Sequence, residues 1–102
     1  MLLFKRKFLD AIRTGEKTQT IRLWKHRRMR AGQASYIPGI GRIHVVSVER
    51  VEISDLTEQD AARDGFATLA DLHAELAQIY AEQPARQAYR VSFSVLPAAV
   101  SS

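Results

Sequence analysis

The stretch RIHVVSVERVEI (42–53) carries the longest β-strand signal in the chain and constrains the fold more than any other segment. Its apolar residues start in one alternation at Ile43 and Val45, shift by one position at Val46, and have shifted back by Val51. Successive side chains of a strand point to opposite faces, so a flat strand cannot bury both sets on one face. A bulged or strongly coiled strand can do so, as in small barrels whose strands turn corners. The stretch therefore predicts a strongly curved sheet of the barrel type.

Further strands and helices are expected on both sides of this stretch. Strands are predicted at MLLF (1–4), as a short buried strand that opens the domain, and at TQTIRLW (18–24), ASYI (34–37) and AYRVSFSVL (88–96). A first helix is predicted over 7–15, where Gly15 takes the place of a C-cap glycine. Two more helices are predicted to begin after Thr57 and Thr68, because each threonine is followed three residues later by an aspartate, as in a capping box. The last helix carries an apolar stripe that we expect to face the core, formed by Leu69, Leu72, Leu76 and Ile79.

Strands interleaved with few helices predict an α+β fold, mainly β, in which helices pack on the outside of a small β-barrel. The 102 residues suffice for a single domain, which we expect to cover 1–97 and to end in a flexible C-terminal tail over 98–102.

The composition excludes several classes of protein. No apolar run approaches the roughly 20 residues that span a bilayer, so we expect no integral membrane protein and no membrane partner. The absence of cysteine excludes disulfides and thiolate metal sites, and the three histidines share no ligand spacing. We therefore expect no metal ion and no cofactor. The N-terminal residues contain no cleavable signal, which predicts a cytoplasmic location.

Charge is distributed unevenly along the chain, whose formal net charge is +4. Residues 17–48 contain seven basic and no acidic residues, whereas 49–75 contain eight acidic residues against two arginines. Five of the basic residues lie within 22–30. Such a run favours a surface for a polyanion such as RNA. The alternative is that the two oppositely charged parts pack together and neutralise each other.

Three motifs resemble those of the ASCH domain family. They are G-x-K-T-x-T-I-R at 15–22, L-T-x-x-x-A at 56–61 and the pair Ile79-Tyr80. The resemblance covers nearly the whole chain. It implies a PUA-like fold, a small β-barrel with flanking helices, and an RNA or nucleoside ligand in a cleft beside the barrel.

One branch of this family, the bacterial N(4)-acetylcytidine amidohydrolases, implies a catalytic set of lysine, threonine and an acidic residue. These roles fall on Lys17, Thr20 and Asp64. Asp64 stands where the branch has glutamate, so the carboxylate is one methylene shorter, and the branch lacks the basic run. By residue chemistry alone, a lysine serves as a base only if burial lowers its pKa. The alternative is a surface lysine beside an ordinary strand threonine.

The same reasoning gives a set of candidate binding residues. Arg22 is expected either to contact a phosphate or a base edge, or to pair with an acid of the second half. Trp24 is either a stacking platform for a base or a core residue. Tyr36 is a further stacking candidate, although a core position is the simpler expectation. The basic loop, defined here as 25–30, is expected to contact phosphates through Lys25, His26, Arg27, Arg28 and Arg30.

The leading hypothesis is an ASCH domain that interacts with RNA or a nucleotide in a basic cleft. The alternative is an amidohydrolase that deacylates N(4)-acetylcytidine or a related nucleoside. Both require Lys17, Thr20, Arg22 and Asp64 to converge on one cleft. If Lys17 is a functional residue that contributes little to packing, Lys17→Ala should slow a reaction and leave stability nearly unchanged.

Overall fold

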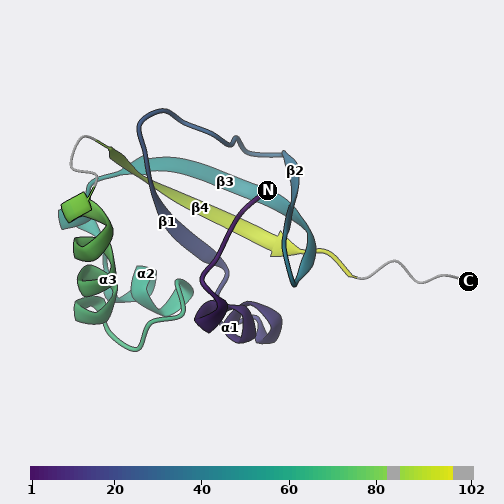
Figure 1. The fold of residues 1–102 in the computed structure, drawn as a ribbon, viewed down its shortest axis with the longest axis horizontal. Helices are drawn as coiled ribbons and strands as arrows, with labels where there is room; N and C mark the ends of the chain where they lie inside the picture. The colour runs from purple at the N-terminus through teal and green to yellow at the C-terminus, as the bar shows by residue number, and fades with distance from the viewer. Residues whose placement is uncertain (83–85, 98–102) are drawn as a thin grey trace, which may run out of the picture.

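The computed structural model describes residues 1–82 and 86–97, and the described part is an α+β fold in which helices pack against a four-stranded antiparallel sheet (Figure 1). The elements run in the order η1 (Arg6–Phe8), α1 (Leu9–Thr14), β1 (Gln19–Trp24), β2 (Ala34–Ile37), β3 (Gly41–Val51), η2 (Ile53–Asp55), α2 (Glu58–Arg63), α3 (Leu69–Glu82) and β4 (Gln87–Val95). The predicted tail at 98–102 lies outside the described residues. No helix within the described ranges is long and apolar enough to cross a bilayer.

The order of strands in the sheet is β1-β4-β3-β2, so β1 and β2 form its two edges and the sheet is not closed into a barrel. The predicted irregularity of β3 is confirmed, because its register against β4 shifts between Val45 and Ser47. Val46 occupies this bulge and is exposed, whereas Val45 and Val48 are both buried. The extra residue lets two apolar positions three apart in sequence face the same core.

The N-terminal segment 1–4 is not the strand that its apolar residues predicted. It has extended backbone without a ladder of hydrogen bonds, and of its first three residues only Leu2 is buried. Leu2 donates its N–H to Tyr36 O on β2 (2.9 Å), and Leu3 O accepts a hydrogen bond from Arg22 on β1. The segment therefore links the two edge strands without closing the sheet, along the path that Figure 1 shows.

Two apolar clusters cover the two faces of the sheet. The alternating residues Tyr89, Val91 and Phe93 of β4 belong to the first cluster, as their spacing predicted. The second cluster packs beneath α2 and α3, where Leu72 and Leu76 are buried as predicted and Leu69 and Ile79 are partly buried. Its members are Ile21, Leu23, Leu56, Ala61, Leu72, Leu76 and Ala88.

Helix α2 is fastened to the sheet by Asp60. Thr57 and Asp60 form the predicted capping box at the start of the helix. The Asp60 carboxylate also accepts two hydrogen bonds from Arg90 of β4 (2.8 and 3.0 Å) and one from Gln19 of β1 (3.2 Å). Because Asp64 follows one helical turn later, these bonds determine where Asp64 lies.

Candidate nucleotide-binding site

A cavity of about 300 Å³ lies beside β1, between this edge strand, α3 and the N-terminal segment. We call it the β1 cavity. The structure brings Lys17, Thr20, Arg22 and Asp64 together in its wall, although Asp64 is 47 residues from Lys17 in sequence. Apolar and aromatic side chains form the rest of the wall, including Phe4, Phe8, Phe66, Leu72, Leu76 and Ile79.

Lys17 and Asp64 form a buried ion pair. The Lys17 ammonium donates to the backbone oxygen of Asp64 (2.6 Å) and to its Oδ1. The two residues are only 3% and 2% exposed. The rings of Phe4, Phe8 and Phe66 surround the ammonium, with centroids 4.8 to 5.7 Å from Nζ.

The local backbone explains how Lys17 reaches this position. Gly15 ends α1 in the left-handed conformation (φ 83°), as its C-cap place predicted. The chain then turns so that Lys17 N donates to Ala11 O (3.0 Å) and Thr18 N donates to Arg63 O (2.8 Å). The lysine is thus held between α1 and the C-terminal end of α2, where Asp64 is the C-cap residue.

Burial changes the protonation behaviour of both partners. Desolvation lowers the pKa of Lys17, and the neighbouring Asp64 carboxylate opposes that shift without cancelling it. Desolvation likewise raises the pKa of Asp64 against the effect of Lys17. Both shifts favour neutral forms, which is the direction needed for proton transfer in a water-poor site. Asp64 Oδ2 is buried and makes no hydrogen bond of normal geometry among residues 1–82 and 86–97, and the backbone N–H of Ile21 lies close enough to this carboxyl to lower its pKa.

Gly65 lies against Lys17 and restricts its position. Gly65 has φ 85°, and a Cβ there would meet Lys17 Cβ at 3.3 Å. We expect Gly65→Ala to cost about 1–2 kcal/mol in backbone strain and an additional amount for displacing Lys17. Gly15→Ala is the matched control, because Gly15 has a similar φ (83°) and nothing within 4 Å of its Cβ position. Urea unfolding of both variants measures the difference, and equal losses would show that the contact with Lys17 is unimportant.

Arg22 and Thr20 are bonded to each other on one face of β1. Arg22 Nε donates to Thr20 Oγ1 (3.1 Å), and its guanidinium lies 4.5 Å from the centroid of the Phe4 ring. Burial lowers the pKa of Arg22 to about 10, so the side chain stays charged at neutral pH. Among the described contacts, Arg22 binds the carbonyl of Leu3 and forms no ion pair with an acidic residue. Thr20 accepts its hydrogen bond from Arg22 and not from Lys17.

The free edge of β1 also faces the β1 cavity. Phe93 N donates to Thr18 O (3.0 Å), and in the antiparallel register this directs the backbone groups of Thr20 and Arg22 toward β4. The N–H and C=O groups of Ile21 and Leu23 then point away from β4, and both residues line the cavity. Arg86 satisfies one of these backbone groups, because its Nη1 donates a hydrogen bond to Leu23 O (3.4 Å).

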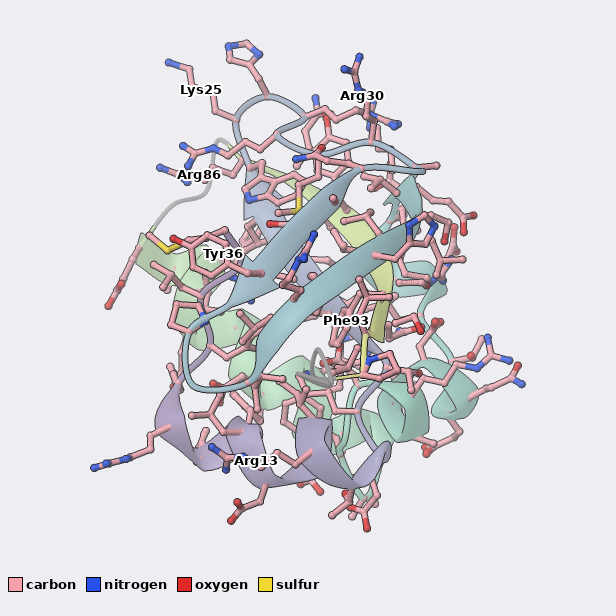
Figure 2. The ribbon with its side chains drawn as sticks, turned by 90° about the vertical axis from the view of Figure 1, so that its right-hand side faces the viewer. Arg13, Lys25, Arg30, Tyr36, Arg86 and Phe93 are labelled. Atoms are coloured by element: carbon pink, nitrogen blue, oxygen red, sulfur yellow. The ribbon has the colours of Figure 1, made fainter. Side chains whose placement is uncertain are left out.

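The basic loop continues from β1 and crosses toward β2, and Figure 2 shows its Lys25 and Arg30 at one end of the molecule. Met29 is buried and anchors it. Arg27 is tied to the sheet through Val48 O (3.2 Å) and lies 5.7 Å from the Tyr89 ring. Arg28 lines the β1 cavity. The side chains of Lys25, His26, Arg28 and Arg30 are exposed, and none of these four forms an ion pair with a residue that the structure describes.

Tyr36 lies elsewhere than expected, and Trp24 fits one of its two interpretations. Tyr36 is on β2, the opposite edge strand, so the structure does not bring it to the cavity. The side chain is 49% exposed, so the alternative, a core position, is also wrong. Trp24 lines the cavity but is only 7% exposed and packs against Tyr89, with ring centroids 5.4 Å apart. This arrangement agrees with the core interpretation and leaves little surface for stacking a base.

Several residues of the site carried no recognisable signal in the sequence. Arg86 precedes β4, far from the basic loop, yet lines the same cavity as Arg28. Glu75 also lines it, and there Lys5 and Lys7 neutralise its charge (2.8 and 3.2 Å). Hydrogen bonds from these lysines hold the pKa of Glu75 below its usual range. Within the described ranges, no group of three or more His, Asp or Glu residues is placed to hold a metal ion.

Comparison with solved structures identifies the class of fold. An ASCH domain from Lactobacillus crispatus JV V101 has a TM-score of 0.71, with 84% of this chain and 68% of that chain covered at 18% sequence identity. A DUF984 protein from Enterococcus faecalis V583 has a TM-score of 0.64, with 88% and 70% covered at 21% identity. The chain therefore has an α+β ASCH/PUA-like fold, which confirms the predicted resemblance at the level of the fold. No protein-family model and no curated protein matches the sequence.

Proposed function

We propose that this protein binds single-stranded RNA, with one base in the β1 cavity and the adjoining phosphates on the basic loop. The observation that carries the proposal is the position of Arg28, which belongs to the basic loop and also lines the cavity. A ligand that enters the cavity is thus within reach of cations that have no acidic partner among the described residues. The motifs that resemble the ASCH family imply the same class of ligand.

The chemistry of the cavity suits a nucleobase. Proteins that recognise single-stranded RNA receive splayed bases in apolar pockets and bind their edges through hydrogen bonds. Here partly buried rings and aliphatic side chains provide the apolar surface. The outward N–H of Leu23 offers a donor at the free edge of β1. A base edge that carries an acceptor matches this donor.

The test of this proposal is the affinity for a single-stranded oligonucleotide at several salt concentrations. We expect binding that weakens as salt rises, because cations on the loop replace counterions condensed on the phosphates. An oligonucleotide that does not bind even at low salt would reject the proposal.

A second candidate function is deacylation of an N(4)-acylated cytidine, and it is favoured by the position of Lys17, Thr20 and Asp64 in one cavity. In such a reaction water adds to the acyl carbon, the C–N bond breaks, and the products are a carboxylic acid and the free amine. Transfer of the shared proton from the Lys17 ammonium to Asp64 would give a neutral amine that accepts a proton of the water and a protonated carboxyl that supplies one to the leaving nitrogen. The lowered pKa of Lys17 and the raised pKa of Asp64 support these roles. Incubation with N(4)-acetylcytidine distinguishes this function, since it predicts release of cytidine.

A further inference from the structure

A second cavity, of about 570 Å³, lies on the other flank of helix α3. We call it the α3 cavity. The β1 cavity is lined by Leu72, Glu75 and Ile79 of this helix, whereas the α3 cavity is lined by His73, Ala77 and Tyr80. These two sets follow the helical repeat on neighbouring sides of α3, and Leu76 between them lines both cavities.

Arg86 connects the two cavities, because it lines both of them. One of its guanidinium nitrogens is used by Leu23 O, which fixes the side chain at the edge of β1. A guanidinium has five N–H groups, so most of its donors remain for an anion. Figure 2 shows Arg86 at the same end of the molecule as Lys25 and Arg30 of the basic loop, and at the opposite end from Arg13.

The α3 cavity has the residues expected of a nucleotide subsite. Arg50 and Arg86 supply positive charge against a single acidic residue, Glu52. Tyr80 is 41% exposed and lies at the wall, where its ring is accessible to a stacked base. Aromatic side chains beside cations are the usual platform for bases of single strands, and such stacking tolerates any base.

We propose that the α3 cavity binds a second nucleotide of the same RNA strand, with Tyr80 stacking on its base and Arg86 contacting the phosphate that joins it to the nucleotide in the β1 cavity. This inference rests on the proposed function, because the first nucleotide is placed by the β1 cavity. The inference adds a second subsite to the proposed function. It also gives the path of the RNA, which runs from the β1 cavity past Arg86 to the α3 cavity.

The test compares ligands that fill one cavity with ligands long enough to fill both. The probes are the four nucleoside 5′-monophosphates and the four homotetranucleotides. Tyr80→Ala should weaken tetranucleotide binding by about 5-fold or more and leave mononucleotide binding unchanged, because it removes only the second stacking surface. Tyr80→Phe keeps the ring and should bind like the parent. Gln78→Ala, also exposed on α3, is the matched control and should have no effect.

The outcomes separate the inference from the proposed function. If Tyr80→Ala leaves tetranucleotide binding unchanged while the parent binds both ligands, the second subsite is wrong and the β1 cavity proposal stands. If Tyr80→Ala weakens both ligands equally, the α3 cavity is not a separate subsite and the inference is also wrong. If the parent binds neither probe, the proposed function fails together with the inference.

Discussion

Replacement of Lys17 by methionine should destabilise the protein by about 3–5 kcal/mol. Lys17 and Asp64 are buried together, and removal of one partner of a buried ion pair leaves the other charge without compensation. Asp64→Asn should have an effect of similar size, because the Lys17 ammonium then remains buried without a counter-charge. Urea unfolding at neutral pH measures both losses.

The double variant Lys17→Met with Asp64→Asn distinguishes the contribution of the ion pair from the contributions of the two side chains taken singly. It removes both charges, so it should be more stable than either single variant, as is typical when a whole buried pair is replaced. It should also show no release of cytidine from N(4)-acetylcytidine if the parent has that activity. Single variants that each lose less than about 1 kcal/mol would contradict the buried ion pair.

The pH dependence of the Lys17→Met variant provides an independent check. Without Lys17, burial, the largest influence on Asp64, raises the pKa of this carboxyl above its ordinary value of 3.8, opposed only by the Ile21 backbone N–H and the charge of Arg22. A group with a raised pKa in the folded state contributes stability below its unfolded pKa and loses it as pH rises through the folded pKa. The variant should therefore recover part of its lost stability as pH is lowered toward about 4.

Replacement of the exposed loop cations should produce the largest change in RNA binding. Each phosphate contact contributes about −0.7 to the slope of log affinity against log salt for a single strand. Lys25, Arg27, Arg28 and Arg30 are all exposed, but Arg27 is held by Val48 O and the Tyr89 ring, so the other three are chosen. The triple alanine variant of these three cations should therefore flatten the slope by about 2 and weaken binding with little regard to sequence.

A control with the same change in net charge is available on the rest of the surface. Arg13, Arg42 and Arg63 are exposed and line neither the β1 cavity nor the α3 cavity. Their triple alanine variant should keep the slope of the parent within about 0.5. A cation that does not contact a phosphate displaces no counterion from the RNA, so its loss leaves the slope unchanged. Equal flattening in the two variants would show that net charge, and not the basic loop, attracts the RNA.

Features encoded by neighbouring residues could be predicted from the sequence. The shifted alternation around Val46 predicted the bulge in β3, and Gly15 and the Thr57–Asp60 box marked helix ends that the structure contains. Each of these signals depends on a spacing of a few residues. The segment 1–4 was misread because an apolar run resembles a strand, although its backbone forms only one hydrogen bond to β2.

The structure of the site depended on contacts between distant parts of the chain. Burial of Lys17 follows from the packing of α1, α2 and three phenylalanine rings around it, and no local pattern announces that burial. The expectation that Lys17 contributes little to stability is replaced for this reason. Tyr80 reaches the α3 cavity through the placement of α3 against the sheet, and Arg86 reaches both cavities from its position just before β4. The motif around Lys17, the position of Asp64 implied by the resemblance and the basic run at Arg28 did point to residues that line the β1 cavity.

The measurement that tests the proposed function most directly is an NMR titration of the protein with single-stranded RNA. The backbone amides of Ile21 and Leu23 and the indole N–H of Trp24, the single tryptophan, report on the wall of the β1 cavity. We predict that these signals shift together and saturate with the RNA, whereas the amide of Tyr36 on the opposite edge strand stays in place. Shifts confined to the basic loop, with the signals of Ile21, Leu23 and Trp24 unchanged, would show that no base enters the cavity and would contradict the proposal.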